Sequence, residues 1–202
     1  MSKNPSRFAA VALLGLALAA AGCDRQDSSR EQVNATAALA PPDNAPAAND
    51  SVVVDTIGTL DRSHKGEAAP ILRFQAPDGT ETSAAQFAGK PLLVNLWATW
   101  CAPCVKEMPT LDAMAAAHQG SLQVVPVSQD LDGAAKVKPF FAQHDFKTLQ
   151  PYLDPQAGLS IAYQASLPMS ILYDSTGHEV WRMTGAMDWT TQTAKDLLAE
   201  AR

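Results

Sequence analysis

One stretch of the sequence, between residues 91 and 109, constrains the fold of this chain more than any other. It reads P-L-L-V-N-L-W-A-T-W-C-A-P-C-V-K-E-M-P, and Leu92–Trp97 is an almost unbroken apolar run. Such a run is typical of a strand that is buried on both faces of a parallel sheet. Helical spacing begins at Val105, so Cys101 and Cys104 lie where a buried strand turns into a helix.

Two cysteines three positions apart at the start of a helix suit thiol–disulfide exchange. The free N–H groups and the dipole of a helix N-terminus favour the thiolate of Cys101. Pro103 falls in the first turn, where its missing N–H costs nothing. A zinc site would need two more nitrogen or sulfur ligands, and the 4 histidines are scattered without ligand spacing. The pattern favours redox exchange, with half of a metal site and a pair of inert core cysteines left open as alternatives.

The run V-N-L-W-A-T-W-C-A-P-C-V-K-E-M-P resembles the TlpA/ResA-like family of membrane-anchored thiol:disulfide interchange proteins, which have the thioredoxin fold. A second match, S-L-P-M-S-I-L-Y-D at 166–174, resembles the cis-proline loop of that family, so Pro168 is expected to face Cys101. The resemblance begins at about residue 69 and implies an α/β fold. The expected architecture is a thioredoxin-like three-layer sandwich with an N-terminal hairpin extension and a central strand–helix insertion at 149–162.

The resemblance also implies the catalytic roles. Cys101 is expected to attack the partner and Cys104 to resolve the mixed disulfide, so that the two form the redox disulfide. Glu107 matches the acidic residue that the family carries after the second cysteine, and it is expected to tune the thiols or to move the resolving proton. Its alternative role is to complement the helix dipole. Asn95, which cannot titrate, stands where plain thioredoxin has a buried aspartate.

Three further residues are expected to contact the substrate: Trp100, Pro103 and Leu167. Leu167 would offer its backbone to the partner chain as a short antiparallel pairing. Gly185 resembles a glycine that lets a loop approach the active site, and Trp97 is expected in the core. No metal and no cofactor are expected.

The N-terminal third of the chain resembles an export and anchoring segment. Residues 1–22 carry Lys3 and Arg7 before an apolar segment, which is typical of a signal peptide. The segment ends A-A-G-C, which resembles a bacterial lipobox and implies lipidation of Cys23, with a retained signal anchor as the alternative. Residues 23–65 are rich in Ala, Pro, Asn, Asp and Ser and predict a flexible tether. Within the tether, 51–57 is either a short edge strand or an apolar patch.

The remaining residues, 66–202, predict one domain. Pro126 indicates that its strand lies at an edge or at a strand end, and Asp132 is a candidate cap. The elements expected in this domain are strands at 71–74, 122–128, 169–173 and 179–183, an Asp-Gly turn at 76–80, a helical turn at 83–87, and helices at 102–118, 132–145 and 190–202.

Charge and the residues between the cysteines bear on function. A net charge of −6 without Lys/Arg clusters argues against nucleic-acid binding. Ala and Pro lie between the cysteines, without a histidine to stabilise the thiolate, so the potential should lean reducing. We therefore expect a thiol:disulfide reductase on the periplasmic side of the cell membrane, with the inner membrane favoured by Asp24.

Family resemblance implies the partners of such a reductase. They are disulfides of exported apocytochrome c or of copper-centre assembly proteins, and a membrane thiol-electron donor of the DsbD/CcdA type. A general oxidase or isomerase, a copper or haem chaperone, and a tethered binding module with a vestigial dithiol are the alternatives.

Overall fold

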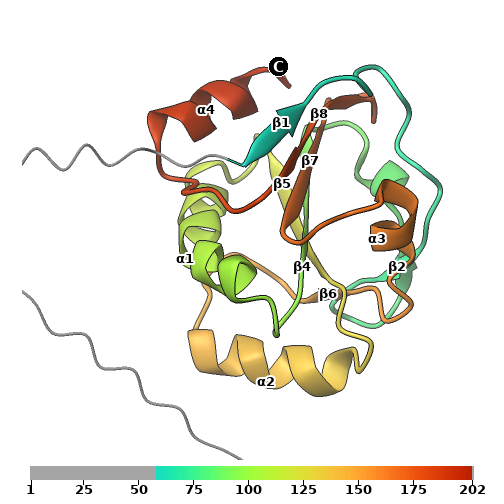
Figure 1. Cartoon of the computed structure of the whole chain (residues 1–202), viewed down its shortest axis with the longest axis vertical. Coiled ribbons are helices and arrows are strands. Elements are labelled where there is room, and N and C mark those ends of the chain that lie inside the picture. Colours follow the sequence, from blue (N-terminus) through green and yellow to red (C-terminus); the bar gives the residue numbers. More distant parts are fainter. Residues whose placement is uncertain (1–57, 202) are drawn as a thin grey trace, which may run out of the picture. The chain divides into compact units, whose positions relative to one another are not determined.

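The computed structural model describes residues 58–201, drawn in colour in Figure 1. The signal segment, Cys23 and the stretch 51–57 lie outside the described residues, so the expectations for them stay predictions. No helix within 58–201 is long and apolar enough to cross a bilayer.

Eight strands within the described residues form one mixed sheet, in the order β1-β8-β7-β4-β5-β6-β2-β3. Their bounds are β1 (Thr59–Asp61), β2 (Phe74–Gln75), β3 (Glu81–Thr82), β4 (Leu92–Trp97), β5 (Gln123–Ser128), β6 (Tyr152–Leu153), β7 (Met169–Tyr173) and β8 (Glu179–Thr184). The apolar run of the sequence is β4, which is buried along its whole length and pairs parallel with β5 and antiparallel with β7. The expected buried strand is therefore confirmed, although the sheet is mixed rather than parallel.

Helices cover both faces of this sheet, which gives the three expected layers (Figure 1). They are α1 (Ala102–Ala117), α2 (Ala134–His144), α3 (Gly158–Tyr163), α4 (Gln192–Ala199) and the 3₁₀ turn η1 (Ala84–Phe87). One apolar cluster joins the sheet to α1, α2 and α4, and a second joins its other face to α3 and η1. Alternate residues of β4 enter the two clusters, as the pleat requires.

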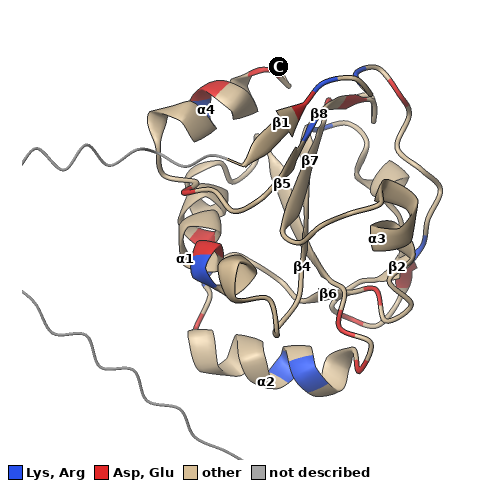
Figure 2. Ribbon diagram, viewed as in Figure 1, with Lys and Arg blue, Asp and Glu red and all other residues tan. Residues whose placement is uncertain are grey.

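The extension and the insertion appear where the sequence predicts them. β2 and β3 form the antiparallel hairpin around the Asp-Gly turn, and β6 with α3 forms the strand–helix insertion between α2 and the loop before β7. The hairpin of β7 and β8 is likewise antiparallel. Figure 2 shows acidic and basic residues spread over several elements; the lysines of α2 are Lys136 and Lys138.

The position of β5 corrects one prediction. Pro126 indicates an edge or a strand end, but β5 lies inside the sheet between β4 and β6. Pro126 pairs with Asn95 of β4, whereas β6 reaches only Val127 and Ser128. Proline is tolerated because no strand pairs with it on the side away from β4.

The described domain begins before the predicted end of the tether at residue 65. Thr59–Asp61 forms β1, which pairs antiparallel with β8 and places Thr59 opposite Thr184. Gly58 makes this approach possible, because a Cβ on Gly58 would lie 2.2 Å from the carbonyl oxygen of Thr184. Residues 59–61 of the predicted tether therefore belong to the sheet.

Two smaller predictions are also wrong. Ile71 was expected in a strand, but it is 86% exposed and β2 begins only at Phe74. Asp132 was expected to cap the second helix, but α2 has Gly133 at its N-cap with a φ of 51°. A left-handed backbone at this position suits glycine, which has no Cβ.

Candidate active site

The two cysteines sit where β4 passes into α1, and they are joined as a disulfide with Cα atoms 5.3 Å apart. Cys101 is the N-cap residue of α1 and is 6% exposed, whereas Cys104, one turn further on, is fully buried. The sulfur of Cys101 is therefore the one nearer to solvent and to the unpaired N–H groups of the first turn. In the reduced protein, this arrangement suits Cys101 as the attacking thiol and the deeper Cys104 as the resolving thiol.

The residues around the pair differ sharply in exposure. Trp100, directly before Cys101, is 70% exposed, and Pro103 is exposed in the first turn of α1. Trp97 is fully buried against Phe140 of α2, with ring centroids 5.0 Å apart, so it is a core residue as expected. Trp100 is therefore the large apolar side chain that a partner approaching Cys101 can touch.

Glu107 lies on the buried side of α1, three residues after Cys104, and is only 4% exposed. The Asn95 amide donates a hydrogen bond of 2.8 Å to Oε1 of Glu107 and a second of 3.0 Å to Oγ of Ser170. The backbone N–H of Met187 donates to Oε2 at 3.0 Å. Glu107 therefore ties α1 to β4 and to the loop that follows β8.

Burial governs the acidity of this carboxyl group. Removal from water raises the pKa of Glu107 from 4.5 to about 7, although the hydrogen bonds from Met187 and Asn95 favour the charged form. A group with this pKa takes up and releases a proton near neutral pH. Glu107 thus has the acidity that proton transfer to or from a neighbouring thiol needs.

Pro168 lies at the same end of the sheet as the cysteines. The Leu167–Pro168 peptide bond is cis, as the resemblance implies. Met169 directly follows it and pairs with Leu96, near the end of β4 that leads to Cys101. Pro168 is buried and Leu167 half-buried.

The loop after β8 supports this proline. Gly185, with a φ of 109°, donates its backbone N–H to the carbonyl oxygen of Pro168 at 2.8 Å. A Cβ on Gly185 would lie 3.0 Å from the Cα of Gly58, so a glycine is needed for both conformation and space. The same loop supplies the Met187 N–H to Glu107, so it braces two predicted site residues at once.

Several parts of this arrangement were missing from the sequence analysis. Ser170 and the Met187 N–H were not singled out, because a backbone donor 80 residues from Glu107 leaves no mark in the sequence. Asp130 was also missed, although it follows β5 at the same end of the sheet and binds Thr99. Within residues 58–201, no three His, Cys, Asp or Glu side chains lie close enough to hold a metal ion.

A cysteine pair at a helix N-terminus, with a cis-proline at the same end of a mixed sheet, defines a thiol–disulfide oxidoreductase of the thioredoxin fold. The profile of the Redoxin family matches residues 64–198, and the chain belongs to this family.

The relatives agree with this class. The chain is 29% identical over 122 residues to the thiol-disulfide oxidoreductase ResA of Bacillus thuringiensis, covering 59% of this chain and 69% of ResA. It is also 29% identical over 116 residues to the thioredoxin-like protein YneN of Bacillus subtilis, covering 56% of this chain and 67% of YneN.

Solved structures share the fold. One from Chlorobium tepidum, described as a thiol:disulfide interchange protein DsbE, matches with a TM-score of 0.61 and 24% identity, over 68% of this chain and 96% of that one. The exposed lipoprotein thioredoxin Etrx1 of Streptococcus pneumoniae matches with a TM-score of 0.53 and 25% identity, over 62% of this chain and 98% of that one.

Proposed function

We propose that this oxidoreductase works as a reductase, tethered to the periplasmic side of the cell membrane and acting on the disulfides of exported proteins. The observation that carries the proposal is the placement of Cys101 and Cys104, one near solvent at a helix N-terminus and one fully buried, above a buried Glu107 whose pKa is about 7. Ala102 and Pro103, between the cysteines, supply no charge that would stabilise the thiolate and make the disulfide strongly oxidising.

The exchange begins with the reduced protein. The thiolate of Cys101 attacks one sulfur of the partner's disulfide, forms a mixed disulfide and displaces one partner thiolate. Cys104 then gives up its proton, for which the Glu107 carboxylate is the acceptor, and attacks the sulfur of Cys101. The second partner thiolate leaves. The partner has gained two electrons, and Cys101 and Cys104 are left as a disulfide.

Trp100, Pro103 and Leu167 complete the proposed site as contacts for the partner chain. Leu167 precedes the buried Pro168 and offers main-chain groups to an extended segment, a mode of recognition that is permissive about sequence. The contact with Trp100 is apolar and follows from its exposure of 70%.

The anchoring and the partners rest on the sequence. Lipidation of Cys23 after export, with the inner membrane favoured, is supported by the A-A-G-C junction and by the similarity to a pneumococcal protein named as a lipoprotein. A retained signal anchor is the alternative. Apocytochrome c or copper-centre assembly proteins are the proposed substrates, and a membrane thiol-electron donor of the DsbD/CcdA type would restore the dithiol.

The decisive experiment is the reduction potential of the Cys101–Cys104 pair, measured by equilibration with glutathione or dithiothreitol buffers. A value in the range of about −200 to −270 mV, which glutaredoxins and thioredoxin span, supports the reductase. A value near about −120 mV contradicts the direction and favours an oxidase or isomerase. Failure to form the disulfide would contradict exchange and favour a copper or haem chaperone.

A trapping experiment tests the order of attack. In Cys104→Ser, the mixed disulfide with a partner should accumulate, because the resolving thiol is gone. In Cys101→Ser, no mixed disulfide should form. Partners recovered with the first variant and absent with the second identify the physiological substrates.

A further inference from the structure

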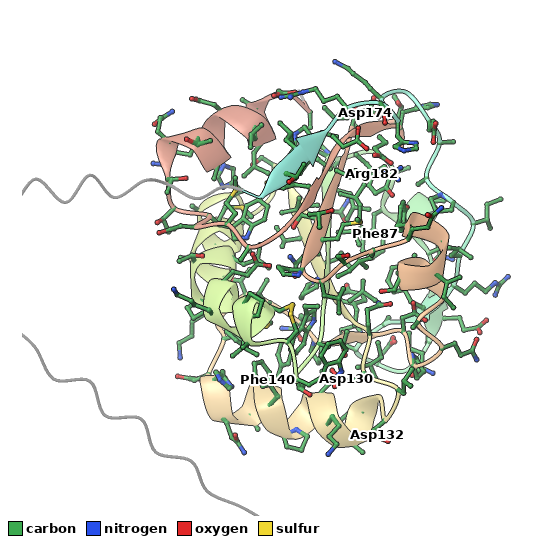
Figure 3. The ribbon with its side chains drawn as sticks, in the orientation of Figure 1. Phe87, Asp130, Asp132, Phe140, Asp174 and Arg182 are labelled. Carbon is green, nitrogen blue, oxygen red and sulfur yellow. A yellow bond between two sulfur atoms is a disulfide. The ribbon has the colours of Figure 1, made fainter. Side chains whose placement is uncertain are left out.

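An acidic side chain lies against the active-site loop without a part in the exchange chemistry. Asp130 follows β5 and is only 3% exposed. Its Oδ2 accepts the backbone N–H of Thr99 at 2.9 Å, and its Oδ1 accepts the Thr99 hydroxyl at 2.6 Å. Thr99 directly precedes Trp100 and Cys101. Figure 3 labels Asp130 at the end of β5, close to the loop that leads into α1.

The remaining hydrogen bond of the Asp130 side chain is with Ser128, the last residue of β5. The Ser128 hydroxyl donates to Oδ2 at 2.7 Å, and no Lys or Arg among residues 58–201 forms an ion pair with this carboxylate. Next to it, the backbone N–H of Gln129 donates to the carbonyl oxygen of Trp97 at 2.8 Å. The buried charge is therefore satisfied by hydrogen bonds that join the end of β5 to the active-site loop.

Two exposed apolar side chains flank this connection. Leu131, the residue after Asp130, is 74% exposed, and Trp100, the residue after Thr99, is 70% exposed. Because Asp130 binds both the backbone and the side chain of Thr99, it fixes the loop that carries Trp100 relative to the loop that carries Leu131. Trp100 directly precedes Cys101, and Leu131 directly follows the side chain that binds the loop carrying Trp100. Exposed apolar side chains placed in this way indicate a contact surface for another chain.

We propose that Asp130 is a positioning residue, which holds Trp100 and Leu131 as one apolar contact surface for the polypeptide around the partner's disulfide. The occupant is a segment of the partner chain with apolar residues next to its cysteines, because the surface adjoins the sulfur that attacks it. The inference rests on exchange at Cys101 but not on the direction of that exchange.

If Asp130 positions this surface, its variants should affect a peptide disulfide and a small disulfide differently. A peptide disulfide flanked by apolar residues must dock on the surface, whereas hydroxyethyl disulfide is too small to use it. Loosening the loop should therefore raise KM for the peptide by about tenfold, because the loop would then have to be ordered when the peptide binds. Turnover of hydroxyethyl disulfide should stay within about twofold of wild type.

The variants are Asp130→Ala, Asp130→Asn and Thr99→Val, assayed as full-length protein with dithiothreitol as the recycling reductant. Asp130→Asn preserves shape and Thr99→Val removes only the hydroxyl bond, so the test stands if Asp130→Ala fails to fold. Asp154→Ala is the matched control. Asp154 is also 3% exposed, and its Oδ2 accepts the N–H of Leu159 at 2.8 Å, whereas its side chain forms no hydrogen bond with Thr99 or Asp130.

A second pair of variants tests the surface itself. Leu131→Ala should raise KM for the peptide disulfide and leave hydroxyethyl disulfide unaffected. Ile161→Ala is its control, since Ile161 is 73% exposed on α3 and has no place in the proposed surface. It should change neither parameter.

Three results would overturn the proposal. The first is an unchanged peptide KM in the Asp130 and Thr99 variants. The second is an equal rise in Asp154→Ala, which would mean that the effect is only lost stability. The third is a rise in Ile161→Ala as large as that in Leu131→Ala. A different failure would refute exchange itself. In that case wild-type protein would turn over neither substrate faster than the Cys101→Ser variant does.

Discussion

Burial of Glu107 should make the stability of the protein fall as pH rises toward neutrality. Its pKa is about 7 in the folded protein against an ordinary 4.5, so between these values the folded state holds a proton that the unfolded state has released. Stability therefore decreases across this window. The difference between the two pKa values corresponds to a total loss of stability of about 3.4 kcal/mol, at about 1.36 kcal/mol per pH unit. About 2.5 kcal/mol of this loss falls between about pH 5 and pH 8.

The perturbation is Glu107→Gln, which keeps the shape of the side chain and removes its titration. The free energy of unfolding is measured by urea denaturation from about pH 5 to pH 8, with Cys101 and Cys104 oxidised so that no thiol titrates. The difference in stability between wild type and Glu107→Gln should change by about 2.5 kcal/mol over this range in favour of the variant. Other titrating groups cancel in that difference.

The control is Glu81→Gln, since the Glu81 side chain is 65% exposed in its ion pair with Arg73. Its stability should run parallel to wild type across the pH range. If Glu107→Gln also runs parallel to wild type, burial does not raise the pKa of Glu107, and its proposed part as proton acceptor loses its basis.

Gly58→Ala should destabilise the oxidised protein by about 1–3 kcal/mol in chemical denaturation, because the new methyl group would clash with the Thr184 carbonyl and push β1 off β8. Asp112→Asn should lower the free energy of unfolding by about 1–2 kcal/mol at neutral pH. Burial raises the pKa of this carboxyl, but backbone N–H groups outweigh it and lower the pKa overall; the deficit should therefore shrink in denaturation below about pH 4. Tyr163→Phe should cost about 1–3 kcal/mol by leaving the buried Tyr173 hydroxyl without its partner; a double change to Phe that recovers none of this loss would contradict the reasoning.

Short-range patterns predicted the centre of this fold well. β4 and α1 follow from an apolar run, a helix-start cysteine and a proline in the first turn, all within 26 residues of sequence. The hairpins were likewise found from their local turn residues, whereas the insertion and Pro168 were predicted from the family resemblance. Hydrophobic period and turn chemistry act over a few residues, so a single sequence displays them.

Contacts between distant residues could not be predicted in this way. Thr99 and Asp130 are 31 residues apart, and Thr99–Asp130 pairing depends on β4 and β5 ending at the same side of the sheet. β1 has only three residues, too few to show a period, and it forms because β8 offers it an edge. Glu107 was predicted from a family resemblance, but its hydrogen-bond partners were not. They come from β4 and from the loop after β8, which only the folded chain brings next to α1.

The short strand β1 also limits edge-to-edge pairing of the sheet with other copies of the protein. Without it, β8 would be the outermost strand, a six-residue edge with unpaired N–H and C=O groups. Such an edge recruits strands from neighbouring molecules. In residues 58–201 the sheet instead ends in β1, of three residues, and β3, of two, which are poor templates for polymerisation. In this part of the chain, Trp100 can therefore stay exposed to partners, with the nearly buried Cys101 next to it, while the sheet offers no long backbone edge for aggregation.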